Sequence, residues 1–411
     1  MDMEIRVTSE TGRLNGVIVH TPGPEVTHVH PDNMHELLFD DIIFESQASQ
    51  EHRDMLEIFR TAMPEGGQVY EVLDLVRQAF GFEEARLFFV ERLIRRYPDK
   101  LLATRREAML ELDAGELTRF AVDGVHAALP DVRLNPSPNI LFTRDLAAVI
   151  GKRIVLSQFA RTARIRESIL METLIMFHSL FDTVRDHVIR IPDTDTIEGG
   201  DILVASENLV LIGMSERTSF SGVMQAGKSI LEKGVETVLI VDIPKQRSSM
   251  HLDTIFTFAS PNECVVFPPA IVNRTHNVVA LRRQGDQLTT SLKPSLKHAL
   301  EEYLHQDMTF INCGGDQTVM QYREQWSDGA NLFCLAPGVV VGYERNVHSF
   351  EAMARHGYSI MTQHEFIAAY KDTGFHPDKS GKIAISFTGH ELCRGRGGAR
   401  CMTLPISRSD D

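Results

Sequence analysis

Short apolar runs that stop at Gly or Pro turns recur along this chain of 411 residues, and they constrain its fold more than any other feature. The run at 17–19 stops at the turn sequence TPGP, and the run at 238–242 stops at Ile243-Pro244. Gly-Gly-Asp occurs at 199–201 and again at 314–316, each time leading toward a β-type segment. Such punctuation predicts short strands joined by turns. We therefore expect an α/β protein with a weak internal repeat, arranged like a propeller around a central site rather than as one open sheet.

One stretch, 72–127, follows helical spacing instead. Its apolar residues, among them Leu73, Val76 and Phe80, fall mostly three or four apart between many Glu and Arg residues. This spacing places the apolar side chains on one face of a helix. The sequence therefore predicts an all-helical insert domain at 72–127, within an α/β domain formed by 1–71 and 128–411.

The charge balance excludes several classes of partner. Lys and Arg number 42 against 56 Asp and Glu, which gives a net charge of −14. Nucleic acid and anionic membrane surfaces both require clustered basic residues, so neither is an expected partner. The apolar runs are too short to span a bilayer, and the acidic start MDME lacks the basic region of a secretory signal. We expect a cytoplasmic protein.

The five cysteines argue against a disulfide framework and against a zinc ribbon. They stand at 264, 313, 334, 393 and 401, an odd number without any Cys-x-x-Cys pair. A disulfide framework uses an even number of cysteines, and a zinc ribbon needs Cys-x-x-Cys pairs.

A match to the Walker A pattern, GVMQAGKS at 222–229, suggests nucleotide binding when taken alone. A phosphate-binding loop of this kind must follow a buried strand directly. Here residues 215–221 separate the apolar run at 209–214 from the first glycine. The segment is better interpreted as a helix capped by Ser219 or Ser221, so nucleotide binding through Lys228 is the less favoured alternative.

Acids and an imidazole stand next to turns in three separate places. Asp145 ends the loop PNILFTRD, and Glu198 and Asp201 flank the glycine turn of EGGD. His251 and Asp253 in MHLDT lead an extended segment, where strand alternation would project both from the same face. Taken singly, each of these is more often a capping or solvated residue than a functional one.

Cys401 stands in a loop that favours a reactive thiol. The segment CRGRGGARCM at 393–402 places Arg394, Arg396 and Arg400 close to it, among glycines whose amides can approach it. Nearby cations stabilise a thiolate, which is the nucleophilic form of cysteine. The competing interpretation, an Arg-Gly tail that binds nucleic acid, fits poorly with an acidic chain and with the apolar segment that follows.

Carboxylates that converge on one pocket bind a cation. A metal site would recruit several His or Cys residues at short spacing, and here the pair at 251 and 253 comes nearest to such a pattern. A guanidinium group suits paired carboxylates, because it offers bidentate hydrogen bonds to each. Thiolate attack on a guanidinium carbon, assisted by a histidine, is then the coherent chemistry.

As an ordered set, the motifs of this chain resemble those of the arginine deiminase family, part of the guanidine-modifying or pentein superfamily. The motifs are LLFDD at 37–41, PNILFTRD at 138–145, RIRE at 164–167, IEGGD at 197–201, IGMSERT at 212–218, MHLDT at 250–254, REQWSDGAN at 323–331 and GRGGARCM at 395–402. The resemblance runs nearly end to end. It implies a five-bladed, pseudo-symmetric α/β propeller with a helical insert.

The resemblance also implies roles for individual residues. Cys401 would be the nucleophile and His251 the general acid and base, while Asp145 and Asp253 would each hold the guanidinium in a bidentate pair. Glu198 would bind the guanidinium and support His251, with Asp201 behind the site. The amino-acid end of the substrate would contact the side chains of Arg164, Arg217, Asn139 and Arg396 and the backbone carbonyls of Leu38, Phe142 and Gly395.

The implied reaction is hydrolysis of L-arginine to L-citrulline and ammonia through a thiouronium intermediate on Cys401. It would need neither a metal nor an organic cofactor. The expected assembly is a homo-oligomer, either a dimer or a tetramer. Arg166, two residues after Arg164, is the alternative contact for the substrate carboxylate. An amidinotransferase and a hydrolase of a modified arginine are alternatives within the superfamily, and a non-catalytic arginine sensor is an alternative outside enzymes.

Overall fold

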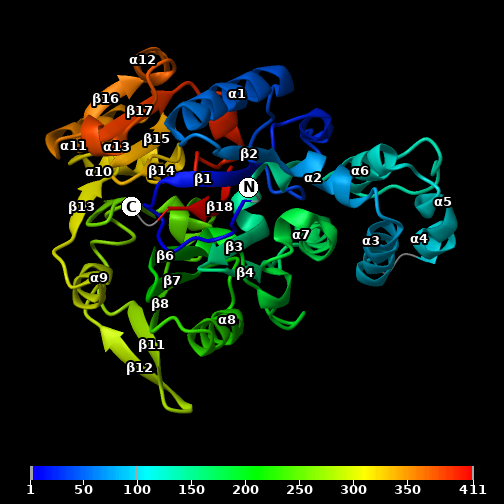
Figure 1. Ribbon diagram of the computed structural model, residues 1–411, viewed down its shortest axis with the longest axis horizontal. Coiled ribbons are helices and arrows are strands. Elements are labelled where there is room, and N and C mark those ends of the chain that lie inside the picture. Colours follow the sequence, from blue (N-terminus) through cyan, green and yellow to red (C-terminus); the bar gives the residue numbers. More distant parts are fainter. Residues whose placement is uncertain (1–2, 98–99, 410–411) are drawn as a thin grey trace.

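The strands form five separate sheets within residues 3–97 and 100–409, the part of the chain that the computed structural model describes (Figure 1). The sheets are β18 (Leu404–Arg408), β1 (Leu14–Val19) and β2 (Gln68–Glu71); β3 (Ala147–Ile150), β4 (Arg153–Leu156) and β5 (Val188–Ile189); β6 (Ile202–Ser206), β7 (Leu209–Met214), β8 (Thr237–Asp242), β11 (Val278–Gln284) and β12 (Gln287–Lys293); β9 (Phe256–Ser260), β10 (Glu263–Val266) and β13 (Thr309–Asn312); and β14 (Phe333–Ala336), β15 (Val339–Tyr343), β17 (Ile383–Phe387) and β16 (Ser359–Thr362). The α/β class expected from the sequence is confirmed.

All five sheets share one plan. In each, a strand has an antiparallel partner on one side and a parallel partner on the other; these strands are β1, β4, β7, β10 and β15. The strand-turn repeat expected from the sequence therefore has a structural counterpart. The first sheet joins both ends of the chain, because β18 pairs with β1 through partners such as Pro405 and Val17.

Helices lie between the strands and on the outside of the molecule (Figure 1). Their bounds are α1 (Glu45–Ala62), α2 (Val72–Ala79), α3 (Glu83–Arg96), α4 (Lys100–Thr104), α5 (Arg106–Leu110), α6 (Ala114–Asp123), α7 (Ile165–Phe177), α8 (Phe220–Glu232), α9 (Leu296–Leu304), α10 (Thr318–Trp326), α11 (Val347–Arg355), α12 (Gln363–Tyr370) and α13 (Pro377–Ser380).

The stretch predicted to be helical contains α2 to α6. A capping box starts α6, in which Asp113 accepts from the amide of Glu116 and Glu116 accepts in return from the amide of Asp113. Gly124 ends this helix with a φ of 76°. The apolar core of α2 to α6 continues into α7 and the sheet of β3, β4 and β5. The division of the chain into an insert domain at 72–127 and a surrounding domain stays a prediction.

The segment that matches the Walker A pattern forms helix α8. Ser219 caps it, since the Ser219 hydroxyl accepts from the amide of Gly222 at 3.1 Å. A Cβ atom on Gly222 would lie 2.1 Å from the carbonyl oxygen of Thr196, so this glycine permits a close approach of two backbones. Lys228 is exposed and lies 4.0 Å from Glu232 one turn later. The segment is therefore the body of a packed helix and not a phosphate-binding loop.

Among the described residues, none of the helices combines the length and the apolar composition needed to cross a membrane.

Candidate active site

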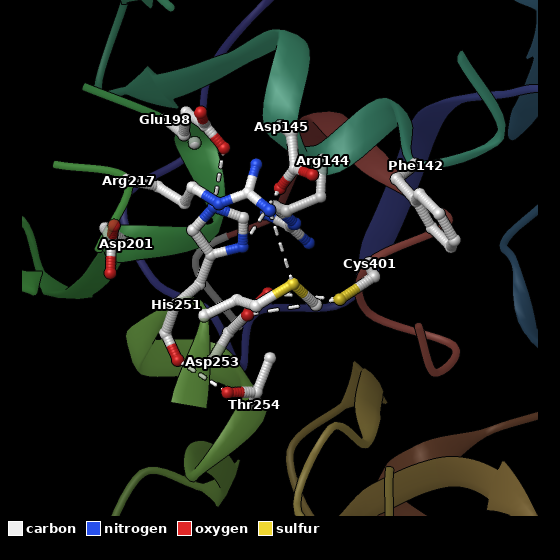
Figure 2. A network of polar contacts seen from close by, with 12 residues as sticks. Phe142, Arg144, Asp145, Glu198, Asp201, Arg217, His251, Asp253, Thr254 and Cys401 are labelled. Atoms are coloured by element: carbon white, nitrogen blue, oxygen red, sulfur yellow. Dashed lines mark hydrogen bonds and ion pairs between the residues drawn. The ribbon is translucent and has the colours of Figure 1, made fainter. Parts of the chain in front are cut away.

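The acidic and imidazole residues singled out in the sequence lie at turns that precede the first strands of three sheets. Asp145 lies in η3 (Thr143–Leu146) before β3, Asp201 ends η7 (Gly199–Asp201) before β6, and Asp253 lies in η9 (Leu252–Thr254) before β9. Glu198 and His251 cap the second and third of these turns. The turns contact one another in the order η3, η7, η9. Cys401 joins them from the loop before β18, and its carbonyl accepts from the amide of Arg144 in η3 at 3.1 Å (Figure 2).

Two glycines allow the turns to meet. A Cβ atom on Gly199 would lie 2.1 Å from the carbonyl oxygen of Arg144. A Cβ atom on Gly200 would lie 2.7 Å from Nδ1 of His251 and 2.8 Å from Oδ1 of Asp145. The Gly-Gly pair of the EGGD motif is therefore required by close packing between site residues.

The predicted strand alternation of His251 and Asp253 is wrong. The segment forms a 3-10 turn at Leu252–Thr254 before β9 begins at Phe256, so the two residues do not lie on a strand. The turn nevertheless leaves both side chains in the site (Figure 2). The Thr254 hydroxyl donates to the carbonyl of His251 at 2.7 Å, which stabilises the turn in place of ladder hydrogen bonds.

His251 lies between two carboxylates. Its Nε2 is 2.8 Å from Oε2 of Glu198, and its Nδ1 is 3.6 Å from Oδ1 of Asp145. Burial alone would lower the pKa of His251, but Asp145 and the hydrogen bond to Glu198 outweigh burial and raise the pKa to about 10. Burial would likewise raise the pKa of Glu198, but the hydrogen bond from His251 outweighs it and lowers that pKa to about 2. At neutral pH the pair is an imidazolium and a carboxylate.

Asp145, Glu198 and His251 also form a cluster of possible metal ligands, with ligand atoms within 4.8 Å of one another. These are the same groups that, by the resemblance, would hold a guanidinium and transfer its protons.

Cys401 is held by Asn331 and faces Asp253. Its amide donates to Oδ1 of Asn331 at 3.0 Å, and Nδ2 of Asn331 donates to the carbonyl of Asp253 at 2.8 Å. The sulfur lies 3.8 Å from Oδ2 and 4.0 Å from Oδ1 of Asp253. Asn331 thus fixes the distance between the thiol and this carboxyl group.

The expectation that arginines around Cys401 create a thiolate is wrong for the protein without substrate. Burial raises the pKa of the Cys401 thiol well above its usual value, and the carboxyl groups of Asp253 and Asp145 raise it further. Arg400 lowers it, but by less. The resting site therefore holds a neutral thiol.

The three arginines of this loop have other partners. Arg394 is exposed and pairs with Asp41 and Glu391. The guanidinium of Arg396 lies 3.6 Å from the ring centroid of Trp326 and donates to the carbonyl of that residue.

Arg400 is buried and links two carboxylates. Its Nη1 donates to Oδ2 of Asp253 at 2.6 Å, and its Nη2 donates to Oε1 of Glu10 at 3.0 Å. One oxygen of Asp253 is therefore already paired within the protein.

A narrow cavity begins at Cys401 and His251. It is lined by ten more residues: Leu38, Asn139, Phe142, Asp145, Arg164, Arg217, Arg247, Met250, Gly395 and Arg396. Asp253, Glu198 and Asp201 do not line it. Asp253 lies beside the sulfur and Glu198 lies behind His251.

Asp201 supports the turns from behind the cavity. Its carboxyl group accepts from the hydroxyls of Ser215 and Thr218, each at 2.6 Å, and from the amide of Leu252 at 2.8 Å. Burial raises its pKa to about 7, although these hydrogen bonds and His251 lower it.

Arg164 and Arg166 point in different directions. Arg164 lines the cavity, donates through Nη1 to Oδ2 of Asp145 at 2.5 Å, and is held by Glu167 at 2.7 Å. Arg166 is buried elsewhere and donates to Ser137 and to the carbonyls of Val122 and Asn135. Of the two arginines that the sequence left open, Arg164 is the one at the cavity.

Arg217 has a guanidinium free to bind a ligand. Its side chain lines the cavity together with Asp145 and His251 (Figure 2), and its contact with Met250 is a long one, 3.7 Å from Nη2 to the sulfur. Within the described residues its buried Nε has no hydrogen-bond partner, and neither has Oδ1 of Asp145. Unpaired buried polar atoms are costly, so both atoms are suited to contact a bound molecule.

Sequence reasoning missed Arg247, which lines the cavity at its mouth. Its Nη2 donates to the carbonyl of Leu38 at 2.5 Å and its Nε to Asp40 at 3.0 Å. Leu38 has a φ of 67°, which a leucine rarely adopts, so Arg247 holds a strained turn over the cavity. A signal was present, since Arg247 stands three residues before Met250, the first residue of the MHLDT motif.

A family model described as arginine deiminase matches residues 105–408 of this chain. The arginine deiminase of Levilactobacillus brevis is 33% identical over 437 aligned residues, which cover 100% of both proteins. That of Oenococcus oeni is 32% identical over 441 residues, which cover 99% of this chain and 98% of that protein.

Solved structures with a similar fold are more distant in sequence. DDAH from Pseudomonas aeruginosa, in a variant complexed with citrulline, has a TM-score of 0.52 at 15% identity and covers 95% of this chain and 99% of its own. The N-terminal domain of ArgZ, an arginine dihydrolase from cyanobacteria bound to its product, has a TM-score of 0.51 at 13% identity, with coverages of 96% and 97%. These structures support the α/β fold.

Proposed function

The chain belongs to the arginine deiminase family, and we propose that it hydrolyses free L-arginine to L-citrulline and ammonia at the cavity above Cys401. The observation that carries this proposal is the placement of the Cys401 sulfur 3.8 Å from one carboxyl group, with His251 and Asp145 on the same cavity. A guanidinium is the cation that such separated carboxyl groups bind best, because its N–H groups can reach both. The two bidentate pairs expected from the resemblance do not fit this structure, since Oδ2 of Asp145 is paired with Arg164 and Oδ2 of Asp253 with Arg400.

Binding of the cation would activate the thiol. The neutral Cys401 results from burial and from the charges of Asp253 and Asp145. A guanidinium placed between these carboxyl groups offsets their charge and stabilises a thiolate. Asp145 would accept through Oδ1, which has no hydrogen-bond partner among the described residues. Asp253 would accept through Oδ1, which lies 4.0 Å from the sulfur, because its Oδ2 is paired with Arg400.

In the first half-reaction the sulfur bonds to the guanidinium carbon and the bond from that carbon to a terminal nitrogen breaks. His251 gives the leaving nitrogen a proton, and the thiol proton replaces the one that His251 has lost. Ammonia departs, and the thiouronium on Cys401 keeps the positive charge.

In the second half-reaction water bonds to the same carbon and the C–S bond breaks. His251 first releases a proton to solvent, and the neutral imidazole then accepts a proton from the water. The sulfur leaves as a thiolate and takes the remaining proton of the attacking water. The products are L-citrulline and the original thiol, with one proton released. Glu198, held at 2.8 Å, orients the ring and stabilises its protonated form.

The amino-acid end of the substrate would lie among the cavity arginines. The Nε of Arg217 is an unpaired donor for the α-carboxylate, and Arg164 adds a second guanidinium that Glu167 holds in position. Arg396, Asn139 and the carbonyls of Leu38, Phe142 and Gly395 would complete the contacts. We assign Arg247 the positioning of Leu38, because it holds the carbonyl of that residue.

The five sheets would be the blades of a propeller around the site, with 72–127 as the insert domain and the rest of the chain as the catalytic domain. The repeated strand plan and the likeness to DDAH and ArgZ support this arrangement. The turns before first strands would then converge at the propeller axis.

The test is incubation with L-arginine and parallel assays of citrulline and ammonia, with Cys401→Ala as control. We expect equal amounts of both products and none from the variant. Agmatine, which lacks the α-carboxylate, should be a poor substrate, with a loss of 100-fold or more in kcat/KM as an order-of-magnitude estimate. Ornithine release in the presence of an amine acceptor would instead identify amidino transfer, and binding of arginine without turnover would contradict the proposal.

A further inference from the structure

Strand β12 is the outer strand of the five-stranded sheet and is unusually exposed. The sheet order is β12-β11-β8-β7-β6, and the hairpin of β11 and β12 projects from the body of the molecule (Figure 1). Residues 287–292 are all exposed, with Leu288 at 37% and Leu292 at 59%. Within the described part of the chain, no strand pairs with the free edge of β12. Such an edge is a template for another strand.

The turn of the hairpin determines which residues point their backbone groups outward. Gln284 and Gln287 close a two-residue turn, in which Gly285 has a φ of 61°. A pair that closes such a turn is hydrogen-bonded, and hydrogen-bonded pairs alternate along an antiparallel ladder. The N–H and C=O groups of residues 287, 289, 291 and 293 therefore face β11, and those of Leu288, Thr290 and Leu292 face outward.

The sequence of β12, QLTTSLK, is nearly palindromic about Thr290. Leucine stands two residues before and two residues after it, and the flanking positions are Thr and Ser. We propose that β12 pairs antiparallel with β12 of a second copy of this chain, about a two-fold axis at Thr290. Leu288 then lies opposite Leu292 of the second copy, and Thr290 lies opposite its own equivalent.

This register satisfies every outward backbone group of the three central residues. In this register, each residue whose N–H and C=O groups face outward lies opposite another such residue. Each of these pairs therefore exchanges two hydrogen bonds. The leucines of both copies lie on one face of the joined sheet, where they pack across the axis. A two-fold interface brings the same patch of both copies together, so a self-complementary strand fits it.

The charges of β12 do not oppose the pairing. The strand carries neither proline nor an acidic residue, and its one charge, Lys293, stands at the end and is paired with Glu302 at 2.7 Å. Central lysines and prolines are the usual devices that prevent edge pairing.

Cross-linking tests the register. Opposite residues of a hydrogen-bonded pair have Cα atoms about 5.5 Å apart, within the range for a disulfide. We expect Thr290→Cys to form a covalent dimer on mild oxidation. Leu288→Cys is the matched control, because its own equivalent lies four residues away along the strand and should not link. The native cysteines are all buried, so the wild-type chain should stay unlinked.

Sedimentation of the full-length protein tests the interface. Thr290→Pro removes an outward N–H without touching the ladder to β11, and should lose the association that depends on β12. The double variant Leu288→Lys, Leu292→Lys should also fail to associate, because the facing lysines repel one another. The double variant Leu288→Glu, Leu292→Lys should associate again. A wild-type monomer of 46.2 kDa at all concentrations, an assembly unchanged by Thr290→Pro, or linking of Leu288→Cys as efficient as that of Thr290→Cys would overturn the proposal. Arginine turnover does not enter this test.

Discussion

At the scale of residues, Cys401 and His251 are both protonated in the site without substrate. The pKa of Cys401 is raised by burial and by Asp253, and that of His251 is raised to about 10 because its carboxylate partners outweigh burial. A neutral thiol is a poor nucleophile, and a bound cation would favour its thiolate form. The site is therefore suited to react when the substrate is bound.

The rate at which iodoacetamide alkylates Cys401 should report this state. Without ligand we expect slow alkylation at pH 7, which rises through pH 9 and above because the pKa of the thiol is raised. Asp253→Asn removes the nearest carboxyl charge and should speed alkylation at pH 7 while it lowers turnover. A wild-type rate that is flat from pH 6 to pH 9 would show that the thiolate is already present.

Arg247 should affect substrate binding more than chemistry, because it holds the turn at Leu38 and Asp40 and lies away from the reacting atoms. For Arg247→Met we expect KM to rise roughly 10-fold with kcat changed less than about 3-fold. Arg247→Lys keeps a cation and should recover part of the affinity. Steady-state kinetics measure the changes in KM and kcat separately. A fall in kcat without a rise in KM would contradict a positioning role.

At the scale of elements, a short turn before a strand is the device that builds the site. Each of η3, η7 and η9 delivers one or two polar side chains and is followed at once by a buried strand. The sequence predicted turns at Asp145 and at Glu198 but a strand at His251. The reason is that alternation of side chains in a short segment does not distinguish a strand from a tight turn that presents both residues.

Glycine substitutions test this packing. Gly200→Ala places a Cβ atom 2.7 Å from His251 and should lower kcat by 100-fold or more, as an order-of-magnitude estimate, because it displaces the imidazole. Gly227→Ala in α8 is the matched control. Its Cβ atom would meet a flexible leucine end at 3.0 Å, and alanine favours the helix. Turnover of Gly227→Ala should be near that of the wild type. Neither Gly227→Ala nor the wild type should bind nucleotide.

At the scale of the whole molecule, buried ion pairs join segments that are distant in the chain. Arg400, beside the nucleophile, pairs with Glu10 near the start of the chain and with Asp253 before β9. Breaking a buried pair leaves an uncompensated charge, which costs about 3 to 5 kcal/mol. The ends of the chain thus contribute to both the fold and the site.

The pH dependence of unfolding should report the pair of Glu10 and Arg400. Burial would raise the pKa of Glu10, but Arg400 and Arg144 outweigh it and lower the pKa from 4.5 to about 2. A lowered folded-state pKa stabilises the protein fully above the unfolded value of 4.5, and this stabilisation is lost as the pH falls toward 2. The shift corresponds to about 3 kcal/mol.

Urea unfolding between pH 6 and pH 3 gives the measurement. Glu10→Gln should be less stable than the wild type by about 3 kcal/mol at pH 6, and the difference should narrow as the pH falls. A difference that stays constant with pH would show that the effect of the variant is not electrostatic.

By itself, the sequence predicted the family of this protein and the residues of its candidate site. The motifs around Cys401, His251, Asp145 and Glu198 named the family, and the spacing of apolar residues located the helices α2 to α6 and the helix behind the Walker match. These features are local, because periodicity and turn residues act over a few neighbouring positions.

The tertiary structure decided which groups neutralise one another. It separated Arg164 from Arg166, paired Arg400 with Glu10 and Asp253 rather than with a thiolate, and added Arg247 and Asn331 to the site. The physical reason is that a protonation state depends on burial and on charges within a few ångströms. These distances join segments hundreds of residues apart, and no local pattern records them.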